Sequence, residues 1–438
     1  MVKILLAAFL TSAAFEPIGI WYLAIFGFAI YLRSLRVSSR PILHSFAFGF
    51  ILNSIVLYWS GKYVGALPWL ALSILQALFY LPVGWIYRRT HSLIWSAITL
   101  LLMEEFRSRF PFGGFGWTRI AFSQVESPAL PIVAIGGVLA LSAFTLIIAL
   151  LFTQIRVKNM AAVLALLIIA LLLPMNPKGS GEIKLIGIQG NTPQVGLEFN
   201  SRAKAVFELH RDATKSVAPS TYDAIVWPEN AIDIDPRLHS DIRADISKLT
   251  DRLKTPIVAG VVQQDSKGPQ NASIMYGGEG APKSAYIKRG LTPFGEYIPL
   301  REISQQLSPL AKSVNDFIPG DKRVTHNITG FKVGPIICYE IVLDDLVRDM
   351  ATNSQALIVQ TNSATFAGTP ESAQQLAITR IRAMEHSRYI LSVSTVGISA
   401  FIDNNGRVLS RTGENTQESL AGVLVPNKYR TLINRVLS

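Results

Sequence analysis

The sequence predicts a chain of two parts: a bundle of apolar transmembrane helices followed by an α/β domain. Half of the 438 residues are apolar and only 16% are charged, and the mean hydropathy of +0.33 is unusual for a water-soluble protein of this size. The residues before Pro177 are overwhelmingly apolar, whereas those after it have the regular acidic and basic residues of a soluble domain. We therefore expect a transmembrane domain over 1–177, a second domain over 181–427 and a short tail at 428–438.

The apolar half divides into seven candidate membrane spans. A helix needs roughly 20 apolar residues to cross about 30 Å of hydrocarbon. The candidates lie at about 3–15, 17–32, 42–60, 66–86, 91–106, 129–154 and 159–175. The first two are short and adjoin at Glu16 and Pro17, so they form either a tight hairpin or one broken element. The first also resembles a signal peptide, but no small-residue cleavage site follows it, so we expect a retained helix.

Basic residues favour one orientation of these spans, because cytoplasmic loops are enriched in Lys and Arg. With the N-terminus inside, the inner loops contain Arg33, Arg36, Arg40, Arg88, Arg89, Arg156 and Lys158. The outer loops contain Lys62, Arg107, Arg109 and Arg119. This bias favours an inside N-terminus, and an odd number of spans then places everything after Pro177 on the extracytoplasmic side.

The longest outer loop, from Glu104 to Arg119, is rich in aromatic residues between Phe110 and Trp117. Aromatic side chains favour the membrane interface, so the loop is interpreted as an anchoring belt, with a lipid access path beside an active site as the alternative. Glu104 and Glu105 end the preceding helix, where snorkelling or solvation explains them as readily as a functional role.

The second half alternates short apolar runs with helical patterns, which indicates an α/β domain of about 250 residues. Strands are expected at Ile183–Gln189, Ala224–Trp227, Pro256–Val262, Ala272–Tyr276, Val333–Tyr339, Ala356–Gln360 and Tyr389–Asp403. Helices are expected at Ser201–Ser216, Pro236–Leu253, Val342–Ala351 and Glu371–Glu385. Several of the strands are continuous Val/Ile-rich runs, as in strands buried on both faces.

Three strand ends in this domain are interpreted as carrying ionisable residues in compact, unusual sequence contexts: Glu229, Lys288 and Cys338. Taken singly, each is more simply a loop carboxylate, a surface lysine or a core cysteine. Together they supply what a cysteine nucleophile needs, namely a base for the thiol proton and a cation for the developing oxyanion. The sequence therefore predicts nucleophilic catalysis by the only cysteine of the chain.

Other classes of function find little support in the composition. The net charge of +11 and pI near 9.7 come without a basic run or an aromatic-interleaved basic motif, so attraction to anionic lipid is favoured over nucleic acid. One cysteine excludes an intrachain disulfide, and the six histidines are scattered singly, so we expect neither a metal site nor a cofactor.

Several motifs resemble those of the apolipoprotein N-acyltransferase family, a membrane-bound branch of the nitrilase, or carbon–nitrogen hydrolase, superfamily. The motifs are Trp227-Pro228-Glu229, Tyr286-x-Lys288 with Pro293-Phe294-Gly295-Glu296-Tyr297, Cys338-Tyr339-Glu340, Gln189-Gly190-Asn191-x-Pro193-Gln194, Thr361-Asn362, Gln374–Glu385 and Gly397-Ile398-Ser399-Ala400. The resemblance implies a nitrilase-like αββα sandwich and a catalytic triad of Glu229, Lys288 and Cys338. It also implies supporting roles for Glu296, Tyr339 and Glu340, whose simpler interpretation is structural.

The same resemblance implies the reaction and its partners. An acyl chain would pass from a membrane phospholipid to Cys338 as a thioester, and then to the N-terminal amine of a diacylglyceryl apolipoprotein. The enzyme would be a multi-pass protein of the bacterial plasma membrane, in contact with the lipid bilayer, with its catalytic domain on the extracytoplasmic side. No nucleic acid and no metal take part.

The sequence departs from the family pattern in two places. The family usually has Thr-Asn-Asp-x-Trp-Phe where this chain has Ser363 and Thr365 in place of the acid and the indole; similar substitutions occur in actinobacterial-type members. The family normally ends in a further membrane helix, and too few apolar residues follow Arg430 to form one. We expect this helix to be either dispensable or absent through truncation.

Two alternatives remain open from the sequence. A membrane-tethered amidase of the same fold would use the same triad to hydrolyse a C–N bond, because the triad does not distinguish water from an amine as acceptor. A non-catalytic membrane scaffold would retain the fold alone. The lipid-embedded half favours acyl transfer over the first alternative, and the intact Glu229, Lys288 and Cys338 disfavour the second.

Overall fold

The computed structural model describes residues 1–437 apart from 197–203, 308–311 and 313–314. The chain forms two compact units, one of Met1–Met175 with Thr431–Val436 and the other of Asn176–Arg430. The start of the helix predicted over Ser201–Ser216 lies outside the described residues.

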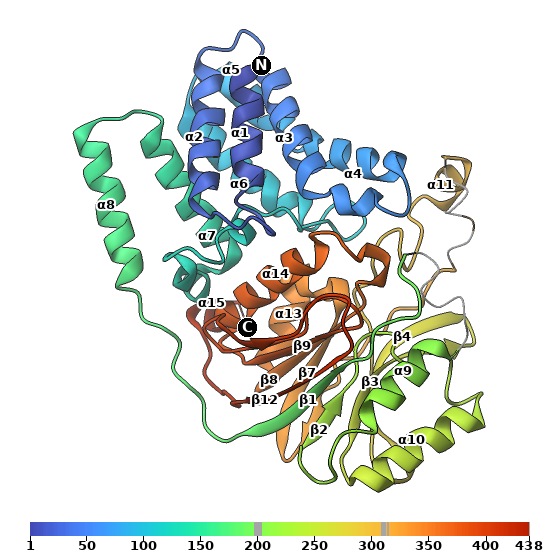
Figure 1. Ribbon diagram of the computed structural model, residues 1–438. Coiled ribbons are helices and arrows are strands. Elements are labelled where there is room, and N and C mark those ends of the chain that lie inside the picture. The colour runs from blue at the N-terminus through green and yellow to red at the C-terminus, as the bar shows by residue number, and fades with distance from the viewer. Residues whose placement is uncertain (197–203, 308–311, 313–314, 438) are drawn as a thin grey trace. The chain divides into compact units, whose positions relative to one another are not determined.

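The first unit consists of helices (Figure 1). They are α1 (Val2–Ser12), α2 (Tyr22–Arg36), α3 (Pro41–Val56), α4 (Ala66–Leu78), α5 (Leu81–Thr90), α6 (Leu93–Arg107), α7 (Val133–Phe152), α8 (Val157–Leu171) and the short α15 (Leu432–Val436). Helices α1 and α2 pack closely because Gly27 of α2 faces Thr11 of α1, where a Cβ atom would lie 2.1 Å from the Thr11 hydroxyl. Helix α15 packs against α7, so the segment Thr431–Val436 is part of this unit.

Two helical segments among the described residues are long and apolar enough to cross a membrane, Ala66–Thr90 and Leu130–Phe152. Each of the other predicted spans also contains a helix, but a shorter one. Helix α1, for example, has 11 residues, which at 1.5 Å per residue reach only about 17 Å. The apolar helices Val2–Ser12, Pro41–Val56 and Val157–Leu171 belong to this shorter group.

The end of α6 contains a buried ionic cluster instead of the solvated carboxylates that the sequence suggested. Glu104 is 2% exposed and accepts hydrogen bonds from the Ile120 amide (2.8 Å) and the Ser142 hydroxyl (2.6 Å). Arg119 is fully buried, and its guanidinium lies 2.7 Å from Glu105. The solvation interpretation of Glu104 was wrong. Its carboxylate lies inside the helical bundle, where a polar group needs hydrogen-bond partners. Arg119 is likewise a packed cation and not a loop charge.

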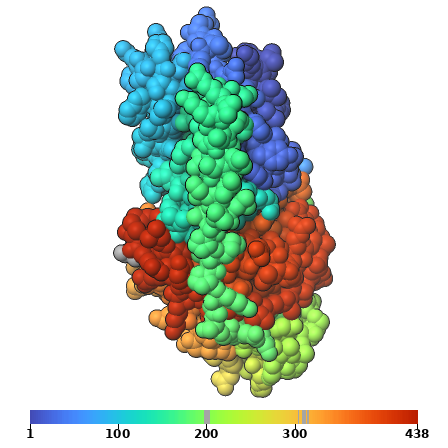
Figure 2. Space-filling model, turned by 90° about the vertical axis from the view of Figure 1, so that its left-hand side faces the viewer, coloured from blue at the N-terminus to red at the C-terminus, as the bar shows by residue number. Residues whose placement is uncertain are grey.

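Helix α8 leaves an apolar surface uncovered within the first unit. Figure 2 shows this helix, in green, running along the face turned to the viewer. The exposed side chains on and beside it include Val157, Leu164, Ile168, Ile169, Leu171 and Leu172. Exposed apolar surface of this extent is typical of contact with lipid or with another apolar partner.

The second unit contains two six-stranded sheets with the strand orders β12-β1-β2-β3-β4-β5 and β11-β10-β9-β8-β7-β6. The strands of the first are β1 (Ile183–Gln189), β2 (Ala224–Val226), β3 (Ile257–Asp265), β4 (Gly268–Tyr276), β5 (Pro282–Ile287) and β12 (Glu418–Leu424). Those of the second are β6 (His326–Ile328), β7 (Phe331–Ile337), β8 (Ala356–Thr361), β9 (Ile390–Ser394), β10 (Ala400–Ile402) and β11 (Val408–Arg411). Strands β1, β2 and β3 are parallel, as are β7, β8 and β9.

The sheets pack face to face, and helices cover their outer faces, which gives the αββα sandwich that the sequence led us to expect. The covering helices are α9 (Ala205–Thr214), α10 (Ser240–Leu253), α13 (Asp344–Thr352) and α14 (Glu371–His386), and the unit also contains the short α11 (Arg301–Leu307). The side chains of alternate residues in each strand point to opposite faces of the sheet. Ala224 and Val226 face the second sheet, whereas Ile225 packs beneath α9 and α10.

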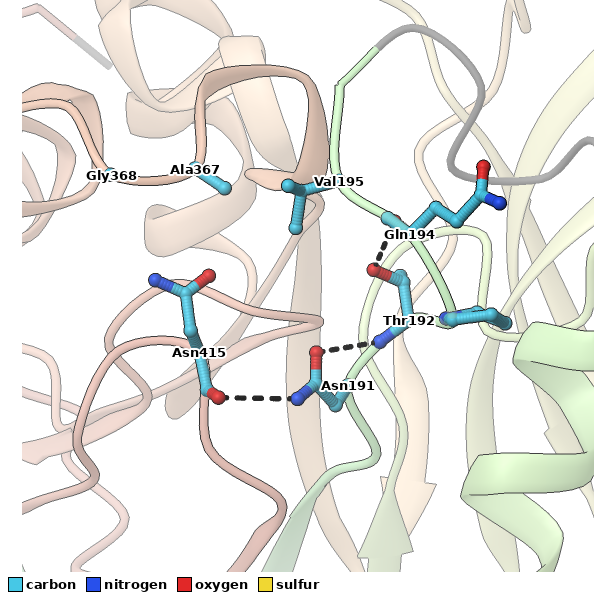
Figure 3. A pocket seen from close by; sticks show the side chains of 8 residues that line it. Asn191, Thr192, Gln194, Val195, Ala367, Gly368 and Asn415 are labelled. Atoms are coloured by element: carbon cyan, nitrogen blue, oxygen red, sulfur yellow. Dashed lines mark hydrogen bonds between the residues drawn. The ribbon is translucent and has the colours of Figure 1, made fainter.

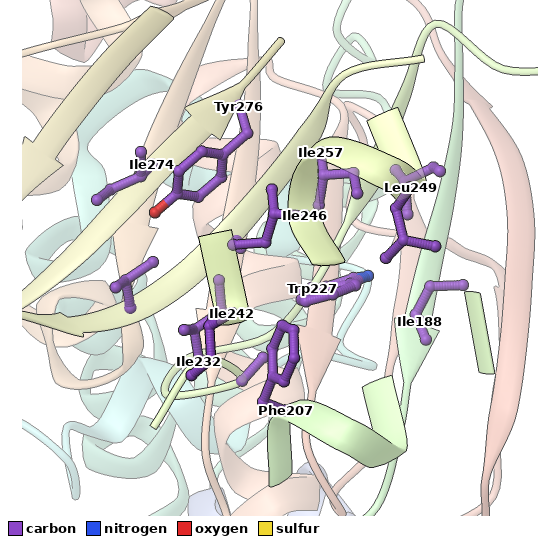
Figure 4. Close-up of a cluster of buried hydrophobic side chains, with 14 of the residues drawn as sticks. Ile188, Phe207, Trp227, Ile232, Ile242, Ile246, Leu249, Ile257, Ile274 and Tyr276 are labelled. Atoms are coloured by element: carbon purple, nitrogen blue, oxygen red, sulfur yellow. The ribbon is translucent and has the colours of Figure 1, made fainter. Parts of the chain in front are cut away.

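A large apolar cluster lies between the first sheet and its helices (Figure 4). Trp227 is fully buried there with Phe207 of α9 and Ile246 of α10. Its indole N–H donates to the Thr214 hydroxyl at 2.9 Å, which satisfies the one polar atom of the ring. Trp227 thereby fixes the end of β2, and the residues that follow it are held against the core.

The expected strand over Tyr389–Asp403 is two strands joined by a turn. Strands β9 and β10 pair antiparallel, with Ser392 opposite Ala400. At the turn, a Cβ atom on Gly397 would lie within 3 Å of three serine hydroxyls, so only glycine fits. Strands β5, β6, β11 and β12 were not predicted, because they lie at or next to the edges of the sheets and their exposed faces are polar.

Candidate active site

Glu229, Lys288 and Cys338 come together from the ends of three strands. Glu229 follows β2, Lys288 follows β5 and Cys338 follows β7. The Lys288 ammonium lies 3.3 Å from Glu229 Oε1, and both charged groups lie close enough to Cys338 to shift the pKa of its thiol. The structure thus brings the three residues together.

The backbone at Cys338 has a conformation that side chains other than glycine rarely adopt. Its φ of 50° lies in the left-handed region, which costs about 1 kcal/mol or more for a residue with a Cβ atom. Cys338 lies where β7 ends and the 3₁₀ turn Cys338–Val342 begins, and its side chain is partly exposed. Burial and the Glu229 carboxylate raise the pKa of the thiol well above its ordinary value, so the resting group is a thiol.

Lys288 is enclosed by two carboxylates. Its ammonium lies 2.8 Å from Glu296 Oε2, in addition to its contact with Glu229, and it donates to the Thr292 hydroxyl at 3.4 Å. Burial alone would lower the pKa of Lys288, but Glu296 and Glu229 raise it above its ordinary value. The side chain is therefore a permanent cation with all three N–H bonds directed at acceptors.

The two carboxylates have opposite pKa shifts. Burial raises the pKa of Glu229, against the attraction of Lys288. Burial also acts on Glu296, but Lys288 outweighs it there and the pKa of Glu296 is lowered. When titratable neighbours have pKa values pushed apart in this way, the group with the raised pKa is the better proton acceptor and the other remains an ion.

Asn271 connects these carboxylates and was not predicted from the sequence. This residue lies on β4, and its amide donates to Glu229 Oε1 at 2.6 Å and to Glu296 Oε1 at 3.0 Å. One amide therefore fixes the separation of both acids. The only signal in the sequence is an asparagine directly before the expected strand Ala272–Tyr276.

Glu340 joins the segments that contain Lys288 and Cys338. It is fully buried, and its Oε1 accepts hydrogen bonds from the Tyr286 hydroxyl at 2.7 Å and from the backbone amides of Arg289 and Gly290 at 2.7 and 3.0 Å. Its Oε2 accepts from the Ile337 amide at 2.8 Å. Glu340 therefore accepts four hydrogen bonds, which join the segment that contains Lys288 to the segment that contains Cys338.

Tyr339, the residue between Cys338 and Glu340, is also buried. Burial raises the pKa of its phenol, and the neighbouring ionisable groups are Tyr297 and Lys288. The structure thus brings all six residues singled out in the sequence into one region of the second unit, and their individual roles stay predictions.

A further acid lies near the thiol on α14. Glu371, the first residue of this helix, is 3% exposed and accepts a hydrogen bond from Ser363, the residue found where the family usually has an acid. Gln375, one turn along α14, has its amide nitrogen 3.8 Å from the Cys338 sulfur. Neither Glu371 nor Gln375 was predicted as a site residue; Gln375 lies in the segment Gln374–Glu385 that resembles the family, and Glu371 lies just before it.

A cavity of about 490 Å³ lies elsewhere on the domain surface. Figure 3 shows its lining, which includes Asn191, Thr192, Gln194 and Asn415. The Asn191 amide nitrogen donates to the Asn415 carbonyl at 3.2 Å. The residues Asn191–Gln194 of the motif noted in the sequence thus form one wall of this cavity.

No group of three histidine, cysteine or acidic side chains that could hold a metal ion is found within the part of the chain that the structure describes. The arrangement around Cys338 consists of a thiol, a base, a cation and hydrogen-bonding groups. Such an arrangement is suited to forming and breaking an acyl–sulfur bond.

Comparisons with known proteins identify a family for each unit. The family model described as carbon–nitrogen hydrolase matches residues 188–432, and that described as apolipoprotein N-acyltransferase N-terminal domain matches residues 7–151. A solved structure of Saccharomyces cerevisiae Nit3, from the nitrilase superfamily, has 18% identity and a TM-score of 0.43, over 58% of this chain and 93% of that one. Because the carbon–nitrogen hydrolase model covers residues 188–432, the second unit is a domain of that family.

Two curated relatives cover both units. Apolipoprotein N-acyltransferase from Mycolicibacterium smegmatis is 32% identical over 450 residues, which are 91% of this chain and 75% of the relative. The enzyme of the same name from Pseudomonas paraeruginosa is 29% identical over 462 residues, which are 96% of this chain and 89% of the relative. The chain belongs to the apolipoprotein N-acyltransferase family. It is therefore an acyltransferase, and the amidase and scaffold alternatives are disfavoured.

Proposed function

We propose that the protein transfers an acyl chain from a membrane phospholipid to Cys338, and from there to the N-terminal amine of a diacylglyceryl-modified lipoprotein. The observation that supports this proposal best is the convergence of Glu229, Lys288 and Cys338 from three strand ends, with the Lys288 ammonium 3.3 Å from Glu229 and both charges close enough to shift the pKa of the thiol. These residues are the base, the cation and the nucleophile that acyl transfer through a thioester requires.

In the first half-reaction, Glu229 takes the proton of the Cys338 thiol and the sulfur attacks the ester carbonyl of the phospholipid. The carbonyl oxygen becomes an oxyanion, which Lys288 and a backbone N–H beside the cysteine stabilise. The contact of Lys288 with Thr292, at 3.4 Å, is the longest of its three, so that N–H is the one that turns to the oxyanion. The C–O bond breaks, Glu229 returns the proton to the departing oxygen, and lysophospholipid leaves.

In the second half-reaction, the amine of the lipoprotein attacks the thioester carbonyl. Glu229 removes a proton from the attacking nitrogen and delivers it to the sulfur as the C–S bond breaks. The products are an amide and the free Cys338 thiol. Glu296 remains ionised throughout, because Lys288 lowers its pKa, and it holds the cation in place.

A membrane location suits this reaction, because both substrates are lipids and extracting an acyl chain costs about 0.8 kcal/mol per CH₂ group. The apolar helices of the first unit and the distribution of Lys and Arg support seven spans, with the second unit on the extracytoplasmic side of the plasma membrane. Alkaline phosphatase fused after Pro177 should be active in this orientation. Activity of a cytoplasmic reporter at that position, without phosphatase activity, would reverse it.

Intact mass spectrometry of the purified enzyme mixed with phospholipid tests the chemistry. We expect one added acyl mass, sensitive to hydroxylamine, on the wild type and none on Cys338→Ala. The exposed carboxylate Glu182 provides the matched control, because Glu182→Gln should acylate as the wild type does. Acylation of a lipoprotein substrate by Cys338→Ala would refute the proposal.

A further inference from the structure

The proposed reaction releases a second proton, for which the residues of the proposed triad provide no acceptor. The amine of the lipoprotein has an ordinary pKa of about 7.7–8.0, so most of it is an ammonium ion at pH 7. An ammonium that becomes an amide loses two protons. One is returned to the Cys338 sulfur through Glu229, and the other needs a second base within the site.

The other groups around the thiol are unsuited to this task. Lys288 is a cation whose pKa is raised by its two carboxylates. Glu296 is bound to Lys288 at 2.8 Å and to the Thr292 amide at 2.8 Å through the same oxygen, and its pKa is lowered. A carboxylate held as an ion in this way is a poor proton acceptor.

We propose that Glu371 binds the ammonium group of the acceptor and takes its first proton. The proposal rests on the thioester chemistry of the preceding section and extends it. Glu371 is 3% exposed, and its Oε2 has no hydrogen-bond partner. An unpaired carboxylate oxygen away from water costs free energy that a substrate N–H would recover.

The position of Glu371 next to the thiol follows from two further observations. Residues four apart on a helix share a face, and Gln375, four residues after Glu371, has its amide nitrogen 3.8 Å from the Cys338 sulfur. The Glu371 carboxylate is also close enough to Cys338 to contribute to the raised pKa of the thiol. An amine attacking a thioester at this sulfur therefore passes close to Glu371.

The electrostatic surroundings of Glu371 make it a base for neutral pH. Burial raises its pKa to about 7, Ser363 opposes this by donating a hydrogen bond, and the facing carboxylates Glu229 and Glu414 raise the pKa further. A base whose pKa lies near the working pH is the most effective proton acceptor. The ammonium gives one proton to Glu371, which later releases it to water, and charge is balanced because cation and carboxylate neutralise each other.

The test separates the two half-reactions in the full-length enzyme with Glu371→Gln, and with Glu182→Gln as the matched removal of an exposed carboxylate. We expect Glu371→Gln to form the Cys338 thioester at the wild-type rate. Its transfer to a diacylglyceryl peptide should be about five- to tenfold slower at pH 7, the factor set by the free-amine fraction, and should equal the wild-type rate at pH 9. Glu182→Gln should behave as the wild type in both steps.

A second acceptor distinguishes proton transfer from a structural effect. Hydroxylamine is an uncharged nucleophile at pH 7, so Glu371→Gln should transfer the acyl group to it as fast as the wild type does. Equal slowing with hydroxylamine and peptide, or a wild-type rate with peptide at pH 7, would overturn the role of Glu371. Absence of a thioester in the wild-type enzyme would instead refute the proposed function.

Discussion

Replacing Glu340 with glutamine should destabilise the catalytic unit by about 2 kcal/mol. The carboxylate accepts three hydrogen bonds at Oε1 and one at Oε2, the latter from the Ile337 amide at 2.8 Å. Glutamine keeps an oxygen for the first three donors but directs an NH₂ group at the Ile337 N–H. One buried amide is then left without an acceptor, which costs about 1–3 kcal/mol. Alanine would leave all four donors unpaired and should cost well over 4 kcal/mol.

The only cysteine provides the assay for this prediction. A dye that fluoresces on reaction with thiols reports the unfolding of the region around Cys338 as the detergent-solubilised enzyme is heated. A loss of about 2 kcal/mol corresponds to a midpoint about 4–8 °C lower for a domain of this size. The exposed Glu182→Gln is the control and should not shift the midpoint. A midpoint for Glu340→Gln within about 1 °C of the wild type would refute the argument that these four hydrogen bonds hold the two segments together.

Three further predictions concern individual groups. Glu296→Gln removes the carboxylate nearer to Lys288, 2.8 Å from its ammonium. It should slow lysophospholipid release at least about tenfold, which is an increase of about 1.4 kcal/mol in the activation free energy. An unchanged rate would exclude a positioning role for Glu296. Arg382→Lys should lower the melting midpoint. The buried guanidinium donates to the Ile341 carbonyl at 3.0 Å and also binds Glu385, and the single ammonium group of a lysine does not reproduce this pair of directed hydrogen bonds. Alkylation of Cys338 by iodoacetamide should rise about tenfold per pH unit from about pH 6 to 9, since burial raises the thiol pKa; a plateau near neutral pH would show a preformed thiolate.

The interior strands of the catalytic unit were predictable because each is a continuous apolar run. Strand β8, for example, is buried at every residue, as expected for a strand covered on both faces. Strand β11 alternates between half-buried and exposed positions, and no apolar run marks it in the sequence. Polar edge strands of this kind resemble loops until their partners are known.

The candidate site was predictable only where a motif marks it. Glu229, Lys288 and Cys338 lie in compact sequence patterns at strand ends. Asn271 and Glu371 do not, since their importance comes from neighbours far away in the sequence: Asn271 contacts Glu229 across 42 residues, and Glu371 lies 33 residues after Cys338 by their numbers. No local pattern encodes such proximity, which depends on how the sheets pack.

The proposed base and the proposed nucleophile belong to different sheets of the sandwich. Glu229 extends from the first sheet and Cys338 from the second. Their separation is set by the apolar core between the sheets, including Val226 and Val333, and by buried hydrogen bonds that cross it, such as that from Gln360 to the Trp227 carbonyl at 2.6 Å. A small slide of one sheet over the other would part the base from the thiol while every strand stayed hydrogen-bonded. Acyl transfer should therefore fail on warming before circular dichroism registers any loss of secondary structure, and substitutions deep in that core should change the reaction rate without touching a polar group.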